Sequence, residues 1–119
     1  YTSQSSQSAL NFARAVLADG HELYRVFFYH DAVYNGSSLL APPQDEVDLH
    51  AEWHALAEQH ELDLVVCIAS ALRRGVIDAT EAERYEKTAS NLSDRFSISG
   101  LGQLIDAALS ADRLVTFRV

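Results

Sequence analysis

The run Leu64-Val65-Val66-Cys67-Ile68-Ala69 decides the fold of this chain. It is apolar on both alternating faces and rich in β-branched residues, as is typical of a strand that is buried on both sides. A second run of this type, Leu23–Tyr29, lies one crossover earlier in the sequence. Strands covered on both faces occur almost only in parallel sheets flanked by helices, so the two runs predict an α/β protein.

Amphipathic segments alternate with these runs. We expect helices over Ser6–Ala18, ended by the cap residue Gly20, and over Gln44–His60. A capping box of Thr80 and Glu83 opens a short helix through Lys87, and Ser99 caps a last helix. The apolar stripes expected to face the core are Ala9, Phe12, Ala13, Val16 and Leu17 in the first helix, Leu49, Trp53, Leu56 and Ala57 in the second, and Leu101, Leu104, Ile105, Ala108 and Leu109 in the last.

Two further strands are expected, at Phe96–Ile98 and Leu114–Phe117. The resulting order α-β-α-β-α-β-α-β predicts one doubly wound, flavodoxin-like domain over 1–119, with a five-stranded parallel sheet in the order 2-1-3-4-5. In that order the first strand lies inside the sheet, yet this sequence begins with a helix. We therefore expect the first strand to precede Tyr1 and to be missing from this sequence.

Composition and charge exclude several classes of protein. The chain has 119 residues, enough for one domain, and nine basic against 17 acidic residues give a net charge of −8. Direct nucleic-acid binding is not expected, because it needs a basic surface. No apolar run is long enough to span a membrane, and the first residues show no secretory signal. With a single cysteine and hence no internal disulfide, we expect a cytoplasmic protein.

Acidic residues gather in one stretch. The segment Gln44–Asp63 contains no lysine or arginine and holds seven of the 17 acids. These are Asp45, Glu46, Asp48, Glu52, Glu58, Glu61 and Asp63. We expect this face to be solvated or to meet a basic partner.

Cys67 is the candidate catalytic residue. A lone cysteine in an apolar strand is most often inert core. Three features favour a reactive thiol instead: the strand's carboxyl end, where doubly wound folds place ligands, the possible helix start at Ser70-Ala71-Leu72, and the nearby cations Arg73 and Arg74. Each of these would stabilise the thiolate, which is the species that attacks sulfur.

Other constellations favour neither a metal nor a cofactor. His50 and His54 have a spacing that permits metal ligation, but Ala51 stands where the zincin pattern places glutamate, and a solvated helix face explains them better. The segment Ser99-Gly100-Leu101-Gly102 resembles a phosphate loop, but Ile105 replaces the third glycine. His21, His30 and His60 lie at element ends, where turns and caps explain them.

Several segments together resemble the DsrE family, and the match covers essentially the whole chain. They are Asp19–Leu23, Val26–Tyr29, Val33–Asn35, Val66–Ala69, Ala71–Val76 and Ile98–Gly102. The most specific part is the cysteine strand followed by Leu72-Arg73-Arg74-Gly75. The match is to the sulfur-relay members of the family, of the TusD and DsrE type, whose members begin with a strand ahead of the position of Tyr1. The resemblance implies a sulfurtransferase in which the cysteine at the position of Cys67 carries sulfur as a persulfide, without cofactor or metal.

The resemblance also implies partners. Relatives of this type associate with two smaller homologous subunits, TusB-like and TusC-like, in a heterohexamer. They receive sulfur from a TusA-like donor and pass it to a TusE-like or DsrC-like acceptor. The relay ends in 2-thiolation of tRNA wobble uridine or in dissimilatory sulfur oxidation, and the wider distribution of the first pathway favours it. A non-catalytic assembly subunit with an inert Cys67 and a nucleotide-binding flavodoxin-like module are the other interpretations.

Two expectations concern surfaces. Part of the apolar surface of Phe27-Phe28-Tyr29, Tyr34 and Leu39–Pro43 should form a subunit interface. A sulfur carrier must also be reached by donor and acceptor. We therefore expect Cys67 at the base of a shallow depression, with backbone N–H groups of the following turn facing the sulfur.

Overall fold

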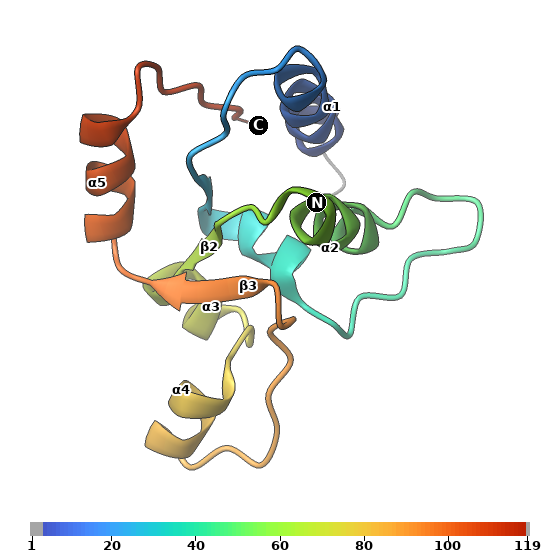
Figure 1. The fold of residues 1–119 in the computed structure, drawn as a ribbon. Coiled ribbons are helices and arrows are strands. Elements are labelled where there is room, and N and C mark those ends of the chain that lie inside the picture. Colours follow the sequence, from blue (N-terminus) through green and yellow to red (C-terminus); the bar gives the residue numbers. More distant parts are fainter. Residues whose placement is uncertain (1–3, 119) are drawn as a thin grey trace.

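The computed structural model describes residues 4–118 as a parallel sheet with helices around it (Figure 1). Its strands are β1 (Val26–Phe28), β2 (Leu64–Cys67) and β3 (Phe96–Ser99). They form a sheet in the order β1-β2-β3, and both pairs are parallel. The α/β class with a parallel, flavodoxin-like arrangement is therefore confirmed.

The sheet differs from the expected one in its strands. Three strands form within the described residues, where the sequence predicts four, and no strand forms over residues 114–117. The Phe117 ring packs instead on Phe12, with ring centroids 5.6 Å apart. Nor does any strand lie between β1 and β2: Phe28 of β1 is the direct register partner of Val66. The two strands thereby satisfy backbone groups that would otherwise face a gap.

The helices begin and end close to the expected positions. They are α1 (Gln4–Ala18), α2 (Leu49–His60), α3 (Ile68–Arg73), α4 (Ala79–Arg84) and α5 (Gly102–Ser110), with a 3-10 helix η1 (His30–Gly36) after β1. Gly20 ends α1 as predicted, with a φ of +84°. Figure 1 shows α1 and α4 at opposite ends of the molecule, with α5 standing beside the sheet.

Three helix starts differ from the prediction. α2 begins at Leu49, not at Gln44, and the carboxylate of its N-cap Asp48 accepts a hydrogen bond from the Ala51 backbone N–H. Asp78, not Thr80, caps α4: its carboxylate accepts a hydrogen bond from the Glu81 backbone N–H. Both residue types can cap a helix, and the earlier one is used here. Ser99 ends β3 and does not cap α5, which begins three residues later without a side-chain cap.

The core lies between the sheet and α2. All four predicted core residues of α2 are buried, and the Trp53 ring meets Phe28 edge-on at 5.4 Å. In α1 the buried residues are Leu10 and Ala13, while Phe12 is 41% exposed. In α5 only Ala107 is buried, so the predicted core stripe of this helix is wrong in the chain alone.

Candidate functional site at the carboxyl edge of the sheet

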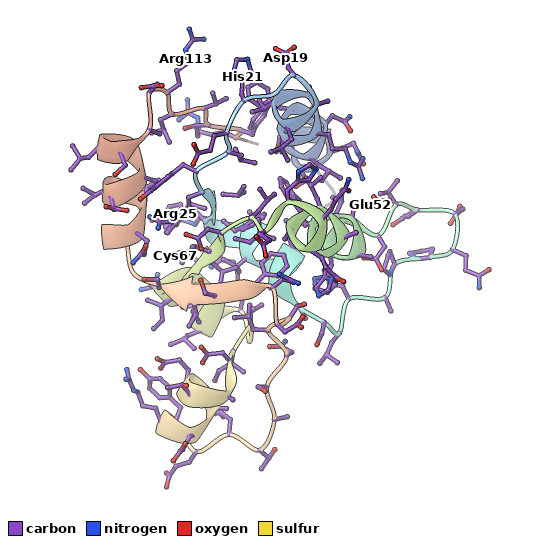
Figure 2. The ribbon with its side chains drawn as sticks, in the orientation of Figure 1. Asp19, His21, Arg25, Glu52, Cys67 and Arg113 are labelled. Atoms are coloured by element: carbon purple, nitrogen blue, oxygen red, sulfur yellow. The ribbon has the colours of Figure 1, made fainter. Side chains whose placement is uncertain are left out.

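Cys67 is the last residue of β2 and the residue directly before α3. Its register partner across the β2–β3 pair is Ser99, the last residue of β3. Because the strands are parallel, all three end at the same edge of the sheet. The predicted position of the cysteine, at the carboxyl edge, is what the structure has (Figure 2).

The surroundings of the thiol differ from the prediction. Cys67 is buried, with only 2% of its surface exposed, and its side chain accepts no hydrogen bond at the start of α3. A depression of about 310 Å³ is lined by Leu72, Gly75, Ile77, Lys87, Thr88 and Ala89, and Cys67 is not part of it. The expectation of an open thiol is therefore wrong for this chain alone. α3 follows β2 without an intervening loop, so Cys67 is both the last residue of the strand and the N-cap of the helix.

The two arginines that follow Cys67 differ in their contacts. Arg74 donates from Nε to Asp31 Oδ1 at 2.7 Å and from Nη1 to the Ser70 carbonyl at 3.2 Å. Because of this hydrogen bond and the charge of Arg74, the pKa of Asp31 lies below its usual range. Arg74 is thus directed to an acid on the segment after β1. Among the described residues, Arg73 forms no ion pair.

The predicted helix-face histidines, His50 and His54, lie near the amino end of β3, whereas Cys67 is at the carboxyl edge of the sheet. His50 stacks on Phe96 and its Nδ1 lies 2.7 Å from the Asn35 carbonyl oxygen. His54 Nε2 lies 2.7 Å from Asp94 Oδ1, and the hydrogen bond lowers the pKa of Asp94. Their side chains are engaged in packing and pairing. No group of three or more potential ligands is arranged for a metal ion within residues 4–118.

The remaining sequence candidates differ in their distance from Cys67. His21 contacts Asp19 at 3.1 Å beyond the end of α1, far from the cysteine (Figure 2). Gly100, which follows the Cys67 register partner Ser99, and Gly102, the first residue of α5, have open space where a Cβ would stand. His30 is the first residue of η1, and its backbone N–H donates to Ser70 Oγ at 3.0 Å.

Sequence reasoning missed the residues that fasten the segment after β1 to α3. Asp31, Ser70 and Arg74 come together only in the fold, and Ser70 is buried at 4% exposure. The parallel order of β1 and β2 was the signal available. Residues that follow adjacent parallel strands meet at one sheet edge, so 29–31 and 68–74 could have been paired.

Comparison with known proteins identifies the family. Residues 1–117 match the model of the DsrE/DsrF-like family. The chain belongs to the DsrE/DsrF-like family. The resemblance predicted from the cysteine strand is thereby confirmed.

Curated relatives of this family cover nearly the whole chain. The chain is 56% identical to the "putative sulfurtransferase DsrE" of Allochromatium vinosum, over 98% of this chain and 90% of that protein. It is 52% identical to "sulfurtransferase TusD" of Sodalis glossinidius over the same shares, and 54% identical to a TusD homolog of Pseudomonas aeruginosa over 97% and 88%. At this similarity the chain is a sulfurtransferase of the DsrE/DsrF-like family.

A solved structure supports the fold. The chain superposes on the ychN protein from E. coli with a TM-score of 0.78 and 25% identity, covering 98% of this chain and 90% of that one. Within the described residues, no helix is both long and apolar enough to cross a membrane.

Proposed function

We propose that this chain is the sulfur-carrying subunit of a relay: Cys67 accepts sulfane sulfur as a persulfide and passes it to an acceptor protein. One observation carries the proposal. The chain's single cysteine stands at the carboxyl end of a central parallel strand, in a member of a family whose relatives are named sulfurtransferases. That edge is where doubly wound sheets place their ligands.

The proposed sulfur transfer needs no oxidant, because each step breaks one S–S bond as it forms another. The Cys67 thiolate attacks the outer sulfur of a donor persulfide, and the S–S bond of the donor breaks. The donor leaves as a thiolate, and Cys67 carries the outer sulfur with its proton as a persulfide. An acceptor thiolate then attacks that sulfur and releases the Cys67 thiolate. Both steps are thiol–disulfide-type exchanges, in which one S–S bond forms as another breaks.

The proposed pathway is 2-thiolation of tRNA wobble uridine in the cytoplasm, with a TusA-like donor and a TusE-like acceptor. The same chemistry serves dissimilatory sulfur oxidation with a DsrC-like acceptor. In this proposal the chain forms one sulfur-relay domain over its whole length. It does not bind the tRNA itself, since a net charge of −8 opposes contact with phosphates.

The proposed assembly is a heterohexamer with TusB-like and TusC-like subunits. Of the apolar residues expected at an interface, Phe28 belongs to the core, whereas Tyr29 is 46% and Leu39 75% exposed. The exposed pair supports a contact in this region. Light scattering with the cognate subunits tests it, and a monomeric chain in their presence would refute it.

A second candidate is a non-catalytic assembly subunit, and the burial of Cys67 favours it. The relay subunit and the assembly subunit are distinguished by incubating the assembled complex with a persulfurated TusA-like carrier and measuring the mass of this chain by mass spectrometry. A gain of one sulfur atom that a reductant removes, and that Cys67→Ser abolishes, supports the relay. No gain from a donor whose persulfide is verified by alkylation rejects it.

A further inference from the structure

The two faces of β3 differ, because apolar residues and serines alternate along this strand. Phe96 belongs to the core cluster and Ile98 packs against it. Since successive side chains of a strand point to opposite faces, Ser97 and Ser99 lie on the face away from this cluster. Ser97 is exposed and Ser99 is partly exposed, and within the described residues β3 is an edge strand of the sheet. Solvent therefore reaches this face along β3.

Cys67 lies on the same face as the two serines. In the ladder between β2 and β3, Val66 is in register with Ile98, and Cys67 is in register with Ser99. Val66 belongs to the core cluster and Cys67 does not. Register partners have their side chains on one face, at a strand spacing of about 4.8 Å. The side chains of Cys67 and Ser99 are therefore direct neighbours across the ladder.

Ser99 is a hydrogen-bond donor at this position. Within residues 4–118, the ladders place only Ser99 beside Cys67, because the ladder between β1 and β2 ends one residue earlier, at Phe28 and Val66. The Ser99 hydroxyl is not committed to a hydrogen bond with another described residue. A serine side chain has three staggered positions and one O–H donor. The hydroxyl can thus turn toward the sulfur while the strand stays in place.

We propose that the Ser99 hydroxyl donates a hydrogen bond to the Cys67 sulfur during sulfur transfer. This inference rests on the proposed function, since it assigns a second residue to the same site. The Cys67 sulfur is negatively charged when it attacks the donor, and the charge returns to it when the acceptor takes the outer sulfur. Because Cys67 is only 2% exposed, a hydroxyl donor stabilises this charge more strongly than it would in water. Ser99 keeps its proton in both steps, so no further reactant is needed.

The release of sulfur from the loaded chain measures this contact. The assembled complex is loaded by a persulfurated TusA-like carrier, a TusE-like acceptor is added, and the mass of this chain is followed over time. Cys67 is the only cysteine, so a persulfide on this chain reports on it alone. Ser99→Ala is expected to lower the release rate about tenfold, the effect of losing one hydrogen bond to a charged atom. Ser99→Thr keeps a hydroxyl and should restore most of the rate.

Ser97→Ala is the matched control, because it removes a hydroxyl from the same face of the same strand. Ser97 is in register with Val65, which has no part in the transfer. This variant should release sulfur at the wild-type rate. Urea denaturation of the two alanine variants should give similar midpoints, which separates a loss of transfer from a loss of stability.

The outcomes distinguish the role of Ser99 from the relay itself. A wild-type release rate in Ser99→Ala, an equal loss in Ser97→Ala, or an equal loss in Ser99→Thr would overturn the role of Ser99 and leave the relay. A wild-type chain that takes up no sulfur, from a donor whose persulfide is verified by alkylation, would reject the relay and the role of Ser99 with it.

Discussion

The segments after β1 and after β3 have opposite relations between apolar content and burial. η1 has the mostly small or polar sequence His-Asp-Ala-Val-Tyr-Asn-Gly, yet Val33, Asn35 and Gly36 are buried. α5 is much more apolar, yet its residues Ile105 and Leu109 are 60% and 83% exposed, and its N-cap Leu101 is 49% exposed. Apolar content therefore does not decide which segment packs on this sheet. Close backbone approach and polar anchors decide it.

Backbone approach is clearest at Gly36. A Cβ built there would lie 2.9 Å from Leu92 Cδ1, 3.2 Å from Val66 Cγ1 and 3.3 Å from Phe96 Cδ2. Polar anchoring is clearest at α5, which depends on Arg25. That guanidinium donates to Asp63, Asp106 and the Gln103 carbonyl, and its side chain is only 12% exposed.

The largest expected effect is that of Gly36→Val. The valine methyl groups would press η1 away from Val66 and Phe96, and the free energy of unfolding should fall by about 2–3 kcal/mol. Urea denaturation measures the change. Gly100→Val is the control, because a Cβ there meets nothing within 4 Å. Equal losses in the two variants would mean that close approach of η1 does not matter.

Arg25→Gln tests the other anchor. Loss of the hydrogen bonds to Asp106 and Gln103 should lower the unfolding free energy by about 1–2 kcal/mol, less than for a fully buried ion pair because the acids are exposed. Amide exchange in α5 should accelerate more than in α2. If the α5 amides keep their wild-type protection, the helix is held by its apolar contacts instead.

Acid should loosen the α5 anchor by a smaller amount. Hydrogen bonds from Arg25 and then Tyr24 lower the pKa of Asp106. Because the folded state binds this proton less readily than the unfolded state, the stabilisation is complete above the usual carboxyl pKa of about 4 and is lost as pH falls through the lowered value. Urea midpoints at several pH values should fall less steeply below about pH 4 in Asp106→Asn than in the wild type. Parallel curves would show that Asp106 is not coupled to folding.

The smallest expected effect is that of Leu109→Ser on the exposed face of α5. With the side chain 83% exposed, the unfolding free energy of the chain alone should change by less than about 0.5 kcal/mol. Thermal unfolding of the two proteins at equal concentration measures it. A clear loss that grows as the chain is diluted would indicate that this face is covered by another molecule.

The sequence predicted those elements whose own residues determine their environment. β2 is apolar at every position and is buried throughout, and the stripe of α2 faces the core as expected. The carboxyl-edge position of Cys67 follows from the same strand. These features need only the period of the apolar residues and the direction of the strand.

The features that the sequence did not predict depend on distant partners. Periodicity shows that α5 has an apolar face, but not that the helix would stand beside the sheet with that face exposed. The contacts among Asp31, Ser70 and Arg74 join residues that follow two different strands, so no local pattern contains them.

The parallel pairing of all three strands has a consequence for how the chain folds. Val26 pairs with Leu64, 38 residues away, and Leu64 with Phe96, 32 residues away. Long loops must close before either ladder gains hydrogen bonds, and proteins dominated by such contacts fold slowly. β2 needs partners on both edges, so it is the last strand to be fully shielded. Until then the thiol that the folded chain buries is open to oxidants, and newly made chains are the form of this protein most exposed to damage at Cys67.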